Sequence, residues 1–262
     1  MFNTLATRRC CADHLEEQLD PLRTSGTAFV ATVSPSRTRA VIEAGANLAP
    51  VDQPEYFRII ATGPDGARVR TTHPDYPLIV LEEFAAFATL QSTSHFMLAS
   101  DGPIMLASVS PSQEAAGIPR GNPGGDPSSV VVPPIEQFRR NYVFLTPDKY
   151  RFDFVRIIAE PEAVIVFDNR ELEHVPGCTT APADGLTLAQ RGDLPPPWVV
   201  HTCQLSFPVV DPETGGMQDG IQNDHVHRIE SDRPVGVIVN GFDSFVSYAY
   251  AGGTELMQIV VE

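Results

Sequence analysis

The stretch HRIESDRPVGVIVNGFDSFVSYAYAGG, residues 227–253, repeats a pattern that occurs earlier in the chain. The earlier segment, HFMLASDGPIMLASVSPSQ at residues 95–113, has the same order of Ser-Asp, one variable residue, Pro and an apolar run. The two Ser-Asp pairs, at 100–101 and 231–232, are separated by 131 positions. Self-similarity of this kind indicates that the chain contains two copies of one structural unit.

A second pair of matching segments supports the repeat. YFRIIATGPDGARVR at residues 56–70 is similar to FVRIIAEPEAVIVF at residues 154–167, so that Arg58 corresponds to Arg156 with an offset of 98. The second copy therefore carries about 33 additional residues between these two points. Most of them fall in a Pro- and Gly-rich segment, residues 170–196.

Short runs of β-branched and aromatic residues, separated by turn residues, occur along the whole chain. The 262 residues include 24 Pro and 19 Gly, and apolar and charged residues alternate in places, as in ARVR at 67–70. Such patterns are typical of antiparallel sandwiches and barrels. Together with the repeat they predict an all-β fold of two similar antiparallel β-sandwich modules in tandem. The expected parts are an N-terminal segment at 1–24, a first module at 25–137 and a second module at 138–262.

The Ser-Asp-x-Pro element is predicted to be a turn in both copies. Ser and Asp side chains accept hydrogen bonds from nearby backbone N–H groups, and Pro fixes its own φ angle. Each element is expected to separate two strands, 94–100 from 103–110 and 225–231 from 234–242. The residues concerned are Ser100, Asp101 and Pro103 in the first copy and Ser231, Asp232 and Pro234 in the second.

The charge of the chain excludes some classes of partner. The formal net charge is -15 at pH 7, and Lys149 is the only lysine. Nucleic acids and anionic lipid surfaces require a positive face, so neither is an expected partner. No run of 18 apolar residues is present, so no membrane span is expected. The first residues, MFNTLATRRCC, lack the apolar core of a signal peptide.

The four cysteines leave two arrangements open. Cys178 and Cys203 bracket a loop rich in Pro, Gly and Thr, and a disulfide between them would staple that loop; the alternative is a pair of buried thiols. Cys10 and Cys11 are adjacent, and their pairing is left open. No Cys or Cys/His spacing typical of a zinc site occurs.

No metal or cofactor is predicted, although two groups of residues are candidates. His225 and His227 are two positions apart, which on a strand places both rings on one face. The loop 211–224 is acidic but does not follow the calcium-binding EF-hand pattern, so a solvated hairpin is the preferred interpretation and calcium the alternative. The acidic candidates in that loop are Asp211, Glu213, Asp219 and Asp224.

The sequence offers no catalytic residue. It contains no G-x-S-x-G elbow, no H-E-x-x-H motif and no phosphate-binding loop. Tyr248 and Tyr250 alternate along one predicted strand, and an exposed row of aromatic rings would stack on sugars. In a sandwich, however, alternating aromatic residues belong more often to the core.

Three segments, taken in order, resemble a known family. They are CADHLEEQLDP at 11–21, GDPSSVVVPPIEQFRRNYVFLTPDKY at 125–150 and HRIESDRPVGVIVNGFDSFVSYAYAGGT at 227–254. They are similar to the N-terminal domain of the IgGFc-binding protein family, and to its bacterial members most of all. The resemblance implies a secreted or cell-surface, all-β, non-enzymatic module. Family members are exported, so this chain is expected to be part of an exported protein whose signal peptide is absent here.

These observations predict a non-enzymatic extracellular binding or adhesion module whose loops contact a protein or a glycan. The loops most suited to this role are 111–127, 170–196 and 211–224, because they are long and the repeat indicates that the first two are insertions. One alternative is a carbohydrate-active enzyme or a carbohydrate-binding accessory domain. Another is a structural spacer within a large surface protein.

Overall fold

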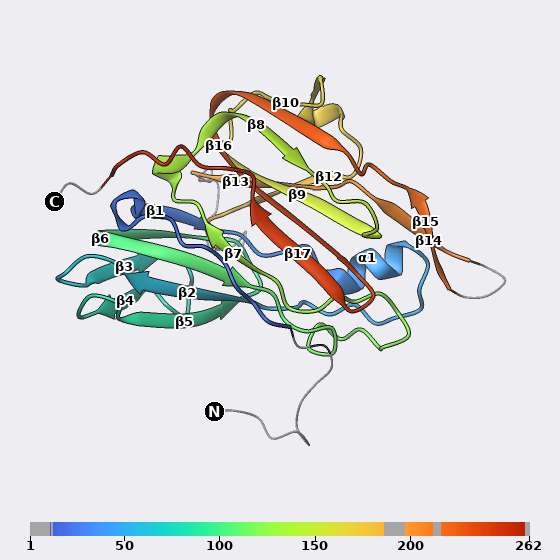
Figure 1. The fold of residues 1–262 in the computed structure, drawn as a ribbon, viewed down its shortest axis with the longest axis horizontal. Helices are drawn as coiled ribbons and strands as arrows, with labels where there is room; N and C mark the ends of the chain where they lie inside the picture. The colour runs from blue at the N-terminus through green and yellow to red at the C-terminus, as the bar shows by residue number, and fades with distance from the viewer. Residues whose placement is uncertain (1–10, 12, 186–196, 212–215, 260–262) are drawn as a thin grey trace, which may run out of the picture.

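The computed structural model describes residues 11, 13–185, 197–211 and 216–259. Within these residues the chain is mostly β, with two curled antiparallel sheets, one from each half of the chain (Figure 1). The predicted all-β fold class is therefore confirmed. Strands of the first sheet end at Val132 and those of the second begin at Arg139. The module limits themselves stay a prediction.

The first sheet has the strand order β4-β3-β6-β2-β5, and β1 and β7 also pair with β6. A short helix, α1 (Arg37–Glu43), follows β1, and a 3-10 turn, η2 (Leu22–Thr24), precedes it. The strands are β1 (Gly26–Ala31), β2 (Glu55–Ala61), β3 (Ala67–Thr71), β4 (Leu78–Leu81), β5 (Phe87–Ser92), β6 (Phe96–Val109) and β7 (Ser129–Val132).

The second sheet has the order β11-β10-β16-β9-β13-β12, and β8 and β17 also pair with β16. Two 3-10 turns, η3 (Ile135–Gln137) and η4 (Leu172–His174), accompany it, and β14 and β15 form a separate hairpin. The strands are β8 (Arg139–Leu145), β9 (Phe152–Ala159), β10 (Ile165–Phe167), β11 (Arg170–Glu171), β12 (Cys178–Pro182), β13 (Val199–Gln204), β14 (Phe207–Val210), β15 (Met217–Ile221), β16 (Val226–Asp243) and β17 (Val246–Ala251).

One long strand organises each sheet, and the two long strands have equivalent partners. β6 pairs with β1 and β3 along its first part and with β2 and β7 along its second part. β16 pairs in the same way with β8, β10, β9 and β17. Ile59 lies opposite Leu106, and Ile157 lies opposite Val237. These pairs are related by the same offsets, 98 and 131, that the sequence shows.

The Ser-Asp-x-Pro elements are not turns, and this prediction was wrong. Both lie inside a long strand, Ser100, Asp101 and Pro103 in β6 and Ser231, Asp232 and Pro234 in β16. Each forms a bulge. Two steps along β1 match the five steps from Ala99 to Ile104 along β6, and two steps along β8 match the five from Glu230 to Val235 along β16.

The strands continue through the bulges because side chains replace the interrupted backbone pairing. Asp101 Oδ1 accepts a hydrogen bond from Arg68 N at 2.7 Å, just before the β3 residues that pair with β6. Asp232 Oδ1 accepts one from Val164 N at 2.8 Å, at the corresponding position before β10. A bulge bends a strand and increases its twist. It therefore lets the same strand pair with one set of neighbours before the bend and another set after it.

The two sheets share a hydrophobic core. One cluster of buried side chains combines Phe57 and Phe96 of the first sheet with Ile158, Val200 and Ile238 of the second. A second cluster lies within the second half of the chain. In a third, α1 and the loop after β6 contact strands β9 and β16. The two halves are therefore packed against each other rather than only linked in sequence.

Buried charged side chains connect the two halves within this shared core. Arg156 of β9 is fully buried, and its Nη1 donates to the carbonyl and the hydroxyl of Thr32, each at 2.8 Å. Burial lowers the pKa of Arg156, and the charge of Glu55 opposes that shift. Glu55 is also buried, and it acts in the same way on the buried guanidinium of Arg37. By contrast Arg58, which matches Arg156 in the repeat, is exposed and lies 4.9 Å over the ring of Phe87.

Replacing Glu55 with Gln should destabilise the protein by about 3 kcal/mol, because two buried arginines then lose the carboxylate that balances them. Chemical denaturation of both proteins at pH 7 measures the change in the free energy of unfolding. The matched control is Glu82→Gln, since Glu82 is an exposed carboxylate in the turn between β4 and β5 and its loss should cost less than about 0.5 kcal/mol. Equal stabilities of the two variants would contradict the role assigned to Glu55.

Candidate functional site in the second sheet

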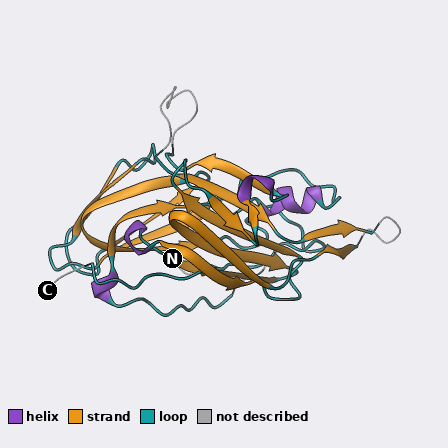
Figure 2. Ribbon diagram, turned by 90° about the horizontal axis from the view of Figure 1, so that it is seen from above, coloured by secondary structure: helices purple, strands orange, loops and turns teal. Residues whose placement is uncertain are grey.

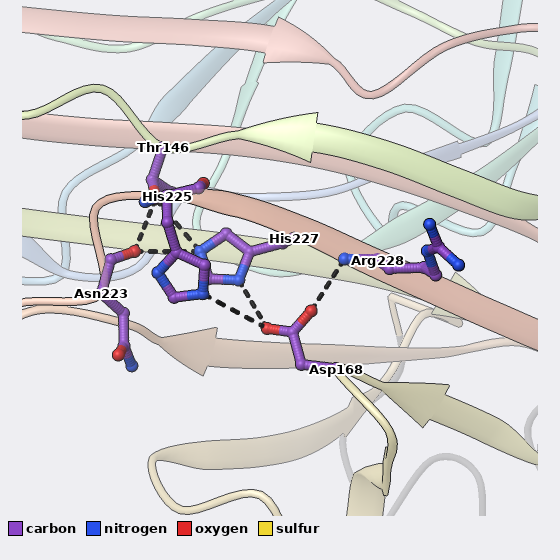
Figure 3. A network of polar contacts seen from close by, with 6 residues as sticks. All are labelled: Thr146, Asp168, Asn223, His225, His227 and Arg228. Carbon is purple, nitrogen blue, oxygen red and sulfur yellow. Dashed lines mark hydrogen bonds and ion pairs between the residues drawn. The ribbon is translucent and has the colours of Figure 1, made fainter.

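Two histidines and one aspartate come together where β16 begins (Figure 3). His225 directly precedes β16, and His227 is its second residue. Asp168 comes from the tight turn between β10 and β11, where Asp168 and Asn169 have φ angles of 48° and 65°. Asp and Asn are among the residues that tolerate such angles in two-residue hairpins. Arg228 N donates to Asp168 Oδ1 at 2.8 Å and so fixes the carboxylate beside β16.

The ring of His227 is buried and contacts aromatic rings and oxygen atoms. It is 1% exposed, and its centroid lies 5.2 Å from the ring of Phe144 and 5.3 Å from that of Phe167. Nδ1 lies 2.7 Å from Asp168 Oδ2. Nε2 lies 3.0 Å from the carbonyl oxygen of Asn223 and 3.1 Å from the hydroxyl of Thr146. Both ring nitrogens therefore have oxygen partners.

His225 completes the cluster from the solvent side. Its side chain is 53% exposed, its ring centroid is 4.2 Å from that of His227, and its Nε2 lies 3.9 Å from Asp168 Oδ2. The coordinating atoms of the three side chains lie within 4.8 Å of one another. The two histidines that the sequence places on one face thus meet a third residue, Asp168. Sequence reasoning missed Asp168 because it comes from a different hairpin, and its only local signal is Asp-Asn between two short strands.

The three acidic candidates of 211–224 that lie within the described residues have different polar partners. Gln218 Nε2 donates to Asp211, Arg151 Nε lies 3.3 Å from Asp219 Oδ1, and Ser206 Oγ donates to Asp224 at 3.4 Å. Glu213 lies outside the described residues. The segment contributes to the β14–β15 hairpin, which extends away from the sheets (Figure 2). The preference for a solvated hairpin over a calcium loop stays a prediction.

A buried carboxylate lies close to the start of this hairpin. Asp153 of β9 is fully buried and accepts hydrogen bonds from Ser206 Oγ at 2.8 Å and Tyr248 Oη at 2.6 Å. Burial raises the pKa of Asp153 to about 6. Tyr250 donates its hydroxyl to Leu145 O. The two tyrosines considered for sugar stacking therefore direct their hydroxyl groups to protein partners.

Stability should fall as the pH rises from about 4 to about 6, because Asp153 keeps its proton in the folded state while the unfolded chain, with an ordinary value of 3.8, has lost it. The shift corresponds to about 3 kcal/mol. Replacement of Asp153 with Asn should reduce this slope, as measured by denaturation at a series of pH values; part of the slope should remain, because burial also raises the pKa of Asp126 to about 6. The control Asp219→Asn removes an exposed carboxylate nearby and should keep the full slope. An unchanged slope in Asp153→Asn would contradict the assignment.

Cys178 and Cys203 form a disulfide. They lie directly opposite each other on the paired strands β12 and β13. Cys11 is also part of a disulfide, and Cys10 lies outside the described residues. The Cys178–Cys203 bond fixes β12, which belongs to the 170–196 segment, to the body of the second sheet.

A pocket of about 570 Å³ lies beside this disulfide. Such a volume is within the usual range for ligand sites. Its acidic residues are Glu171 and Glu173, whose side chains are 61% and 74% exposed. Burial lowers the pKa of His201, and its Nδ1 lies 2.8 Å from Thr180 Oγ1. The lining residues are Pro161, Ala163, Val164, Ile165, Glu171, Leu172, Glu173, Val175, Cys178, Thr180 and His201.

The three loops singled out in the sequence have different roles. The described part of 170–196 forms a wall of the pocket, and 211–224 contributes to the projecting hairpin. The loop 111–127 is instead tied to the second sheet. Gly125 N donates to Asp243 O at 2.8 Å, and Asp126 N donates to Ser247 Oγ at 3.0 Å. This loop joins the halves of the molecule.

The fold and these surfaces define an all-β protein built from a repeated sheet, with a pocket of about 570 Å³ and a histidine cluster in the second copy. The family model described as IgGFc binding protein matches residues 2–241, which is nearly the whole chain. The chain belongs to this family, which is an extracellular, protein-binding one. No curated protein and no solved structure matches it. Among the described residues, no helix is long and apolar enough to cross a membrane.

Proposed function

We propose that this protein is a non-enzymatic extracellular binding or adhesion module that holds a protein partner at the pocket beside the Cys178–Cys203 disulfide. The observation that carries the proposal is the combination of an apolar floor with two carboxylates at the rim. Ala163, Ile165 and Leu172 supply apolar surface, while Glu171 and Glu173 stay in solvent. Family membership supports a protein as the partner.

The chemistry of the pocket favours a basic side chain with an apolar stem. An arginine or lysine lays its methylene groups on apolar surface and keeps its charged end in water. In this pocket that charged end would meet the carboxylates of Glu171 and Glu173, because η4 and β11 place both at the opening. The net charge of -15 favours approach of a basic partner over the whole surface.

The rigidity of the surroundings also supports this role. β12 and β13 are paired over five residue pairs and closed by the disulfide, and β13 pairs in turn with β9. A pocket wall that is already fixed loses little conformational freedom on binding. The described part of the loop 170–196 is therefore the candidate surface that we propose for contact with a partner.

Binding to a mixed array tests the proposal. The array holds IgG Fc, mucins, glycans, and arginine- or lysine-containing peptides with glutamate-substituted counterparts. We expect binding to proteins or peptides with basic residues, and about tenfold weaker binding by Glu171→Gln/Glu173→Gln, since each exposed ion pair contributes up to about 1 kcal/mol. Surface plasmon resonance on the array hits measures the difference.

The control Glu82→Gln/Glu83→Gln removes the same charge from an exposed pair in the turn between β4 and β5 and should bind as the unmodified protein does. Equal loss in both double variants would show only a general charge effect and would overturn the pocket assignment. Binding to glycans alone would favour the carbohydrate-binding alternative. A blank array from folded protein would favour the structural spacer.

A further inference from the structure

We infer that Asp168, His225 and His227 bind a divalent transition-metal ion, with Zn²⁺ as the best match to two imidazoles and one carboxylate. The three residues lie where the β10–β11 turn meets the start of β16, next to the pocket but outside its lining. Metal binding here is independent of the partner proposed for the pocket.

Two oxygen atoms face Nε2 of His227. The carbonyl oxygen of Asn223, 3.0 Å away, can only accept a hydrogen bond. The hydroxyl of Thr146 has its shortest contact, 2.7 Å, with the same carbonyl, so its hydrogen is directed there. The hydroxyl oxygen therefore faces Nε2 as a second acceptor, at 3.1 Å. Nε2 must carry a hydrogen.

The opposite nitrogen of the ring, Nδ1, faces a carboxylate oxygen. If the ring is neutral with its hydrogen on Nε2, then Nδ1 presents a lone pair to Asp168 Oδ2 at 2.7 Å. Two acceptors this close to each other need a proton or a metal ion between them. A proton there would be bonded to Nδ1 or to the carboxyl group of Asp168, whereas a metal ion would accept the lone pairs of both atoms.

The position of His225 favours a metal ion over a proton alone. A proton would use only His227 and Asp168, yet His225 Nε2 also lies 3.9 Å from the same carboxylate oxygen. A tetrahedral ion with bonds of about 2.0–2.2 Å separates its ligand atoms by roughly 3.3 Å. The separations of 2.7 Å and 3.9 Å in this structure lie on either side of this value. Binding therefore needs two small adjustments: the ring of His225, which is 53% exposed, moves closer, and the carboxylate of Asp168, which is 33% exposed, moves away from Nδ1.

The surrounding hydrogen bonds resemble those of metal sites. A metal-bound histidine typically donates its other N–H to a carbonyl or carboxylate, and a ligating carboxylate is itself hydrogen-bonded. Here His227 Nε2 faces Asn223 O, and Arg228 N donates to Asp168 Oδ1. The rings of Phe144 and Phe167 pack against the ring of His227 and hold it in place. The exposed side of His225 leaves room for water as a further ligand.

Titration of this chain with Zn²⁺ after treatment with EDTA tests the inference. Isothermal titration calorimetry should show one ion per chain, and Co²⁺ in place of Zn²⁺ should give the visible absorption of a tetrahedral site. His225→Ala should weaken binding at least tenfold, because it removes an exposed ligand without disturbing the core. Asp168→Asn should do the same, and Zn²⁺ should raise the Tm of the unmodified protein but not that of His225→Ala.

The matched control is His174→Ala. His174 belongs to a second group with Glu171 and Glu173, all three exposed. This variant should bind Zn²⁺ as the unmodified protein does. Absence of stoichiometric binding by the folded protein would overturn the inference and assign the charge beside His227 to a proton. Binding that is lost in His174→Ala, or that no variant changes, would also overturn it, since the ion would then lie elsewhere.

Discussion

The side chains of Asp101 and Asp232 each accept a backbone N–H from a neighbouring strand at the point where a proline interrupts the long strand beside it. This substitution keeps β6 and β16 continuous. Each long strand can then pair with one set of strands before the bend and with another after it. The curl of both sheets, the face that each offers to the other and the position of the histidine cluster at the start of β16 all depend on it.

The two copies have diverged in what they do with equivalent positions. Arg58 lies on the surface against an aromatic ring, whereas Arg156 is buried where the sheets meet. The additional residues of the second copy contribute η4 and β12, and with them much of the wall of the pocket and one half of a disulfide. The first copy instead has a long loop that ties it to the second. The pocket and the histidine cluster thus lie in the second copy, and the first copy packs against it.

Much of this arrangement follows from local features of the sequence. The offsets 98 and 131 predict the same register that pairs Ile59 with Leu106 and Ile157 with Val237. The spacing of His225 and His227 places both rings on one face. The Ser-Asp-x-Pro element was wrongly predicted to be a turn, because its residue types are compatible with a turn and with a bulge. The deciding partners, Arg68 N and Val164 N, come from other strands, and local propensity does not contain them.

The same limit explains Asp168 and the loop 111–127. Asp168 joins the cluster through strand pairing between β10 and β16, and its sequence neighbours show only a turn. The loop 111–127 has the composition of an exposed segment, yet Arg37 donates to Gly124 O and Gly125 N donates to Asp243 O, so its backbone is used as a structural contact. Composition indicates where regular structure ends, but not whether the residues beyond it face solvent.

Both sheets share one hydrophobic core and one set of buried charges. The two copies seen in the sequence are therefore not two separately folding units. In solenoids, each unit contacts only its neighbours and stability is close to a sum over units. Here neither sheet covers its inner face alone, and separation of the halves would leave Arg156 without Thr32 and Glu55. We therefore expect the molecule to unfold as one cooperative unit, although its sequence reads as two copies.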